Sequence, residues 1–104
     1  MTDQSVSLLN GLLQASSSHL YSEIGEEAVI LDISSGVYYG LNEVGVDIWN
    51  WLQEPKTATD IVNLLLEEYD VSQEQAEQDL KSILQEMSAA GLIDIVEAKE
   101  PNRI

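Results

Sequence analysis

Several residue types that common protein chemistries require are missing or scarce in this 104-residue chain. The absence of cysteine excludes a disulfide scaffold, thiolate metal sites and a cysteine nucleophile. The one histidine, His19, lies in a segment expected to be a strand, where we expect an ordinary exposed residue rather than a general base. A catalytic triad needs a base that a third group orients, and no such arrangement is visible. We therefore expect a protein with no catalytic residues that is not an enzyme.

Positive charge is equally scarce. Four cationic residues, Lys56, Lys81, Lys99 and Arg103, stand against 19 acidic residues, so that the formal net charge is −15. Binding to nucleic acid or to an anionic membrane requires clustered lysine and arginine, and these four are scattered. The charge either serves solubility or steers a basic partner toward the protein. We expect no nucleic-acid partner and no membrane association.

The motifs that hold metals and cofactors are also missing. The acidic residues do not follow the spacing of a calcium-binding loop, because the run Glu67-Glu68-Tyr69-Asp70 lacks the required glycine. The six glycines form neither of the common phosphate-binding patterns. Ser34 follows an aspartate as the serine of a carrier protein does, but it lies in an expected hairpin turn rather than at a helix start. We expect no metal and no cofactor.

Long apolar runs are absent as well. A membrane-spanning helix needs about 18 consecutive apolar residues, and none of the apolar segments approaches that length. The stretch Val6–Leu13 is interrupted by polar residues and follows Asp3 instead of a basic segment, which is not typical of a signal peptide. We expect a single-domain cytoplasmic protein, since the length is that of one ordinary domain.

What is present predicts strands first and helices afterwards. Residues 19–24 and 37–41 alternate between apolar and other side chains, and residues 28–33 are β-branched and apolar. Turn signals at Gly25 and at Ser34-Ser35-Gly36 join these three segments into an antiparallel meander. Leu20 and Ile24 share one face of the first strand, and Tyr38 and Gly40 face away from Val37, Tyr39 and Leu41.

Three helices are predicted after this meander. Asn42 is a suitable N-cap for a first helix that stops before Pro55, and Thr57–Asp60 and Ser72–Gln75 have the form of capping boxes for two more. Gly91 is placed to end the third helix, and residues 92–96 form a terminal strand or extended segment. Strands followed by helices indicate an α+β fold. We divide the chain into a flexible or partly helical arm at 1–16, a domain at 17–96 and a polar tail at 97–104.

This order of elements favours an interaction module. If the strand at 37–41 lies at the sheet edge, its open N–H and C=O groups can pair with an extended peptide, and the long helix can form the other wall of a groove. The alternative is that Tyr38, Tyr39 and the stripe containing Met87 are simply core residues. The pattern of residues alone leaves both interpretations open.

An ordered series of short segments resembles the PqqD-like family, named for protein D of pyrroloquinoline quinone synthesis. The matching segments run from Val29-Ile30-Leu31-Asp32 through Gly36–Asn42 and Val44–Trp49 to Gly91-Leu92-Ile93. The resemblance implies a winged-helix-like α+β fold with a three-stranded antiparallel sheet followed by three helices. It also implies a recognition element for ribosomally made, modified peptides, which takes the precursor's leader as an added strand between the third strand and the third helix.

Carried onto this chain, the resemblance implies a set of peptide-binding residues on the third strand and the third helix. They are Val37, Tyr38, Tyr39, Gly40 and Leu41 on the strand, and Ala76, Asp79, Leu80, Ile83 and Met87 on the helix. The pattern Tyr-Tyr-Gly-Leu-Asn followed by Gly-x-x-Ile-Trp is most similar to the stand-alone members of lasso-peptide gene clusters. Such members present the precursor to a leader peptidase and an asparagine-synthetase-like cyclase.

Three other interpretations remain open at this point. The domain can serve a radical SAM enzyme or another peptide-modifying enzyme, as other PqqD-like proteins do. A winged-helix regulator that binds nucleic acid is less favoured, because its reading helix would need basic residues. A dimerising adaptor would expose Trp49 or Trp51 in a surface patch.

Overall fold

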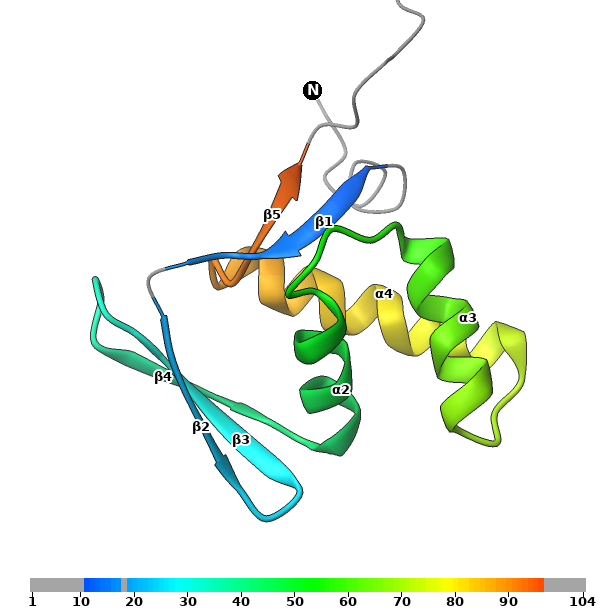
Figure 1. Ribbon diagram of the computed structural model, residues 1–104, viewed down its shortest axis with the longest axis horizontal. Coiled ribbons are helices and arrows are strands. Elements are labelled where there is room, and N and C mark those ends of the chain that lie inside the picture. Colours follow the sequence, from blue (N-terminus) through cyan, green and yellow to red (C-terminus); the bar gives the residue numbers. More distant parts are fainter. Residues whose placement is uncertain (1–10, 18, 97–104) are drawn as a thin grey trace, which may run out of the picture.

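The computed structural model describes residues 11–17 and 19–96 and contains two small sheets and three helices (Figure 1). In chain order the elements are β1 (Leu12–Ala15), β2 (His19–Ile24), β3 (Glu27–Asp32), β4 (Val37–Leu41), α2 (Glu43–Trp51), α3 (Ala58–Glu68), α4 (Gln73–Ala89) and β5 (Ile93–Val96). The expected α+β class, with a three-stranded antiparallel sheet followed by three helices, is confirmed.

The three-stranded sheet has the order β2-β3-β4 with antiparallel pairing throughout. Leu20, Leu31 and Tyr38 are opposite one another across the three strands. Gly36 has a positive φ of 75°, which lets the β3–β4 turn close, and its N–H donates to the Asp32 carbonyl at 2.7 Å. The predicted meander is therefore correct, with strand bounds within one residue of those expected.

The helices begin where the caps were predicted. The Asn42 side chain accepts the Gly45 N–H at 2.9 Å, and Thr57 and Asp60 form a reciprocal capping box. Ser72 accepts the Gln75 N–H, but the Gln75 side chain donates to Asp79 one turn further on rather than completing the second box. Gly91 follows α4 with a φ of 75°, as its position predicted.

The core lies where the inner face of the sheet, the three helices and the β1–β5 pair meet. Its fully buried large side chains are Leu13, Ile30, Ile48, Leu52, Ile61, Leu80 and Leu84. Trp49 is also buried, with Tyr21 stacked at 6.3 Å and His19 edge-on at 6.2 Å between ring centroids. His19 is thus half-buried against a tryptophan and is not the ordinary exposed residue we expected. Burial of Trp49 and partial burial of Trp51 also contradict an exposed tryptophan patch.

The largest departure from the predicted order concerns residues 12–15, which were expected to belong to a flexible or partly helical arm. They form β1, which pairs antiparallel with β5, and Leu13 also exchanges backbone hydrogen bonds with Lys56 at 2.8 and 2.9 Å. The leucines at positions 8, 9, 12 and 13 have a helical spacing in the sequence, but the backbone of residues 12–15 pairs with two segments remote in the sequence. The rest of the arm at residues 1–10 and the tail at 97–104 lie outside the described residues.

Candidate functional site

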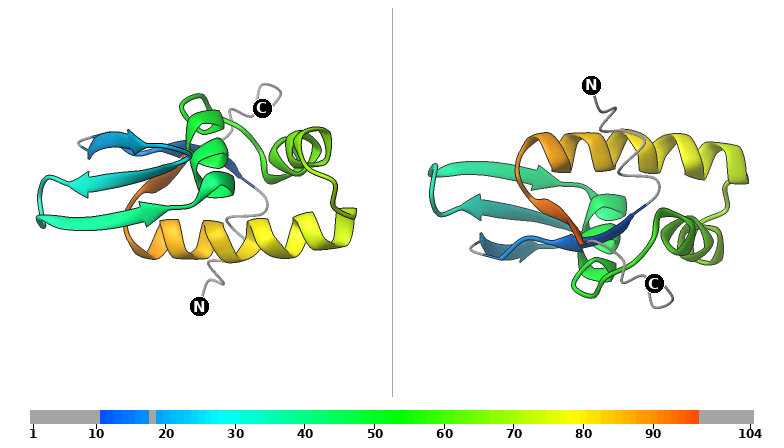
Figure 2. Two further views of the ribbon diagram at one scale, coloured as in Figure 1. Left: turned by 90° about the horizontal axis from the view of Figure 1, so that it is seen from below. Right: turned by 90° about the horizontal axis from the view of Figure 1, so that it is seen from above.

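The order of the strands leaves the outer edge of β4 without a strand partner among the described residues. The C-terminal half of α4 runs beside this edge (Figure 2). Between them is a hollow of about 310 Å³, which we call the β4–α4 groove. It is lined by Tyr39, Gly40, Leu41, Asn42, Gly45, Ile83, Glu86, Met87, Ala90 and Leu92.

The start of α2 shapes one end of the groove. Because Asn42 caps this helix directly after β4, the chain turns sharply and brings Gly45 against Leu41. A Cβ atom at position 45 would lie 3.3 Å from the Leu41 Cδ2 atom and 3.4 Å from the Asn42 Oδ1 atom. Glycine thus permits a close approach between the helix and the strand, which holds the end of β4 in place.

The strand residues predicted to bind peptide divide between the two faces of the sheet. Tyr39 and Leu41 are half-buried and line the groove, together with the exposed backbone of Gly40. Val37, on the same face as Tyr39, and Tyr38, on the opposite face, are both exposed and are not among the residues that line the groove. The alternation predicted from the sequence therefore holds at Tyr38 and Tyr39, whose side chains have opposite surroundings.

On α4, two of the five predicted residues line the groove and three do not. Ile83 and Met87 face it, whereas Ala76 and Leu80 are each only 1% exposed and belong to the core. Asp79 is exposed and accepts a hydrogen bond from Gln75 at 2.8 Å. Met87 is only 3% exposed and also belongs to the core, so it lies where the core stripe of the helix adjoins the stripe that lines the groove.

Five groove residues were missed by the sequence analysis: Asn42, Gly45, Glu86, Ala90 and Leu92. A helical spacing of three and four residues relates Ile83, Glu86, Met87 and Ala90, and this spacing was the available signal. The groove combines an apolar floor with a single carboxylate at Glu86, which suits an extended peptide with apolar side chains.

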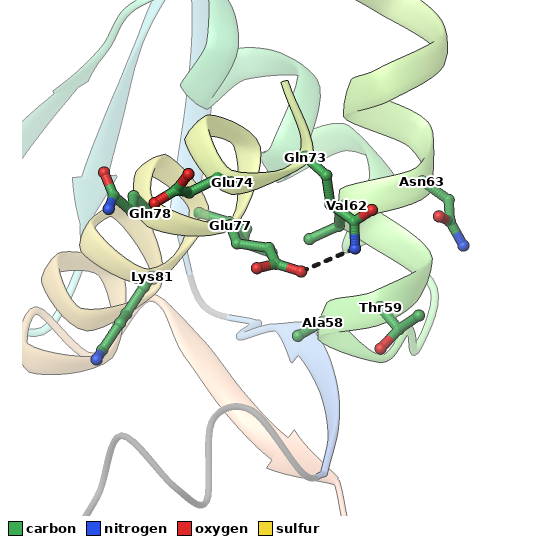
Figure 3. A pocket seen from close by; sticks show the side chains of 10 residues that line it. Ala58, Thr59, Val62, Asn63, Gln73, Glu74, Glu77, Gln78 and Lys81 are labelled. Carbon is green, nitrogen blue, oxygen red and sulfur yellow. Dashed lines mark hydrogen bonds between the residues drawn. The ribbon is translucent and has the colours of Figure 1, made fainter. Parts of the chain in front are cut away.

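A larger hollow of about 500 Å³ lies elsewhere, between the starts of α3 and α4 (Figure 3). Its floor is apolar, with Ala58, Val62 and Leu80, and polar side chains surround it. Among these, the Gln73 amide donates to the Glu77 carboxylate at 3.1 Å. None of its lining residues belongs to β4, so this hollow is separate from the strand edge.

Burial and local hydrogen bonds shift the pKa values of two groups in the three-stranded sheet. Burial and a hydrogen bond to the Glu23 carboxylate raise the pKa of Tyr21 to about 12. Burial would raise the pKa of Asp32, but hydrogen bonds from Ser34 and Ser35 outweigh it and lower the pKa below its usual value.

Within residues 11–17 and 19–96, no group of three or more His, Cys, Asp or Glu side chains is placed to hold a metal ion. Over the same residues, no helix is long and apolar enough to cross a membrane.

Two solved structures share this fold. A protein described as TbiB1 in complex with the TbiA(beta) leader peptide is 30% identical, with a TM-score of 0.72 over 82% of this chain and 99% of that chain. A lasso peptide synthetase B1 complexed with the leader peptide is 23% identical, with a TM-score of 0.69 over 79% of this chain and 96% of that chain. At 23% identity, the match to the lasso peptide synthetase B1 shows only that the two proteins share a fold. A search of curated protein sequences gives no match.

The family model described as coenzyme PQQ synthesis protein D (PqqD) matches residues 27–93. This range contains β3, β4, all three helices and the whole β4–α4 groove. The resemblance seen in the sequence is thereby confirmed, and the chain belongs to the PqqD family.

Proposed function

We propose that this protein recognises the leader of a ribosomally synthesised precursor peptide and presents the precursor to processing enzymes in lasso-peptide biosynthesis. The observation that carries the proposal is the open edge of β4 facing α4 across an apolar groove. The 30%-identical TbiB1, which matches over 99% of its length, is described in complex with a leader peptide. An exposed strand edge next to a groove is the usual arrangement for binding a peptide as an added strand.

In this proposal the backbone of β4 supplies affinity and the groove supplies selectivity. The leader pairs with the N–H and C=O groups along Val37–Leu41. Because side chains alternate along a strand, every second leader residue points into the groove toward Ile83 and Met87. The intervening leader residues point to the opposite face, beside Tyr38.

The same proposal assigns the protein a non-catalytic role in the cytoplasm. Its partners are the leader peptide, a leader peptidase and a cyclase. A radical SAM enzyme or another modifying enzyme is the alternative partner, and the neighbouring genes would distinguish the two pathways. All of the residues assigned to leader binding act by backbone pairing and apolar contact, so no step of the proposal needs a reactive side chain.

Proline substitution tests strand addition directly. Along an edge strand, successive N–H groups point alternately to the neighbouring strand and to the open side. Of the variants Tyr38→Pro and Tyr39→Pro, one therefore removes an open-side N–H while the sheet stays paired. We expect that variant to remain folded by circular dichroism and to lose leader binding, measured as fluorescence anisotropy of a labelled leader peptide.

The matched control places proline at Tyr21 or Ser22 on β2, the opposite edge of the same sheet. The folded member of that pair should bind leader as well as the unaltered protein does.

A second experiment tests the groove side chains: Ile83→Ala should weaken leader binding about fivefold or more, as loss of an apolar anchor does. Val71→Ala, at an exposed apolar position away from the groove, should not. Full leader binding by folded forms of both β4 proline variants would refute strand addition.

A further inference from the structure

The face of the β2-β3-β4 sheet that points away from the helices carries an apolar surface that the leader groove does not use. We call it the outer sheet face. It consists of Leu20, Ile24, Val29, Leu31 and Tyr38. Leu20 is 57% exposed, Ile24 67% and Tyr38 68%. Helix α2 packs against the other face, where Ala28 and Ile30 are buried (Figure 1).

These side chains form one continuous surface rather than scattered exposed residues. The register places Leu20, Leu31 and Tyr38 in one row across the sheet, and Val29 lies two residues along from Leu31 on the same face. Together with Tyr21, Ser22 and Ile24, they line an open hollow of about 530 Å³. Single exposed apolar residues are ordinary, but a contiguous apolar surface marks a contact with another molecule.

The charges around this face indicate the kind of molecule. Glu27 is on the same side of β3 as Val29 and Leu31, and Glu26 lies in the adjoining β2–β3 turn. Glu23 and Asp32 belong to the same two strands, but their side chains are on the opposite face, where Glu23 accepts a hydrogen bond from Tyr21. The two cationic residues in the described part of the chain, Lys56 and Lys81, lie outside this sheet. A second copy of this chain would bring the same acidic residues together, against a net charge of −15 on each copy. A partner with an apolar centre and surrounding lysine and arginine residues fits instead.

The outer sheet face is also continuous with the proposed leader site. β4 contributes Tyr38 to the outer face and Tyr39 to the groove, so one strand borders both. A leader strand added to β4 would extend the sheet, and every second leader side chain would lie next to Tyr38 on the outer face. A protein docked there would therefore touch the recognition protein and the bound leader together.

We propose that the outer sheet face is the docking surface for the processing enzyme that cleaves the leader, and that the enzyme binds it with an apolar patch ringed by basic residues. The inference rests on the proposed function, because the leader forms part of the completed surface. It explains why a sheet face with five apolar side chains stays uncovered by the helices of this chain. It also predicts that the enzyme binds the leader-loaded protein more tightly than the empty one.

The test uses the variant Leu20→Lys/Ile24→Lys, which replaces apolar side chains on β2, the strand farthest from the leader edge. The probe is the purified leader peptidase from the same gene cluster, with binding followed by biolayer interferometry in the presence of leader. We expect the double variant to bind peptidase about tenfold or more weakly, in line with loss of a central apolar anchor. The affinity of the double variant for the leader, measured by fluorescence anisotropy of the labelled peptide, should not change. Peptidase binding to the unaltered protein should also weaken as salt rises.

Val71→Lys is the matched control, because it adds a positive charge at an exposed apolar position outside the outer sheet face. It should bind peptidase like the unaltered protein. Normal peptidase binding by a folded Leu20→Lys/Ile24→Lys variant would overturn the docking proposal while leader binding stands. Light scattering that shows a dimer of the unaltered protein, split by the same substitutions, would overturn it by assigning the face to self-association. Failure of the unaltered protein to bind leader would instead refute the proposed function.

Discussion

At the scale of single residues, the tyrosine hydroxyls connect elements that are separate in the sequence. The Tyr69 hydroxyl at the end of α3 donates a hydrogen bond to the Asp47 carboxylate in α2. Burial, together with this bond and the charge of Asp47, raises the pKa of Tyr69 well above its ordinary value. The bond therefore stabilises the protonated phenol and links the two helices that flank the segment paired with β1.

We expect Tyr69→Phe to lower the free energy of unfolding at neutral pH by about 1 kcal/mol, the usual net value of one hydrogen bond. The folded-state pKa is raised, so this stabilisation is complete below the unfolded-state pKa of about 10 and is lost as pH rises beyond it. The difference between Tyr69→Phe and the unaltered protein should therefore shrink above that pH. Urea unfolding of both proteins at several pH values measures this difference in the free energy of unfolding.

Tyr38→Phe, at an exposed position, is the control for loss of a phenol. A difference between Tyr69→Phe and the unaltered protein that grows with pH would contradict the proposed role of the protonated hydroxyl. Tyr21, with a pKa raised to about 12 by burial and by Glu23, should contribute the same sign of dependence.

At the scale of elements, most helices and strands were predictable because their signals are local. Apolar periodicity, the caps at Asn42 and Thr57, and the glycines at the turns all lie within the segment they define. β1 was missed for the opposite reason. Residues 12–15 acquire a strand conformation from β5 and Lys56, about 80 and 40 positions away in the chain. The sequence spacing of the leucines at positions 8, 9, 12 and 13 is instead that of a helix.

We expect Leu13→Ala to destabilise the protein by about 2–5 kcal/mol, the range for truncating a fully buried leucine. Leu13 has no exposed surface and belongs to the main core. Thermal unfolding of the variant provides the measurement. Leu20→Ala, at an exposed leucine in β2, is the control and should change the stability by less than about 0.5 kcal/mol. Equal stability of the two variants would contradict a structural role for β1.

At the scale of the whole molecule, the distribution of charge separates this protein from other winged-helix-like domains. The exposed side of α4 carries Glu74, Glu77, Asp79 and Glu86 with Lys81 as its one cation. A helix that reads DNA has the reverse composition, because phosphate binding requires several lysines or arginines. The acidic residues therefore favour a peptide or protein partner over a nucleic acid.

We expect no retardation of duplex DNA in a mobility-shift assay, even at about 50 mM salt where nonspecific electrostatic binding is strongest. The repulsion between the DNA backbone and a chain of net charge −15 is the physical reason. A basic DNA-binding domain of similar size serves as the positive control. Salt-sensitive retardation by this protein would revive the regulator interpretation.

The sequence by itself determined the class of fold, the order and caps of nearly all elements, the net charge and the family. These follow from periodicity, capping residues and composition, which each segment carries without reference to its neighbours. The tertiary structure decided which faces of those elements meet. It paired β1 with β5, enclosed Ala76 and Leu80 in the core while Ile83 lines the groove and Met87 borders both, and left Leu20, Ile24 and Tyr38 uncovered. Such choices depend on how whole elements pack, because one helix or strand presents several similar stripes and only its neighbours determine which one is buried.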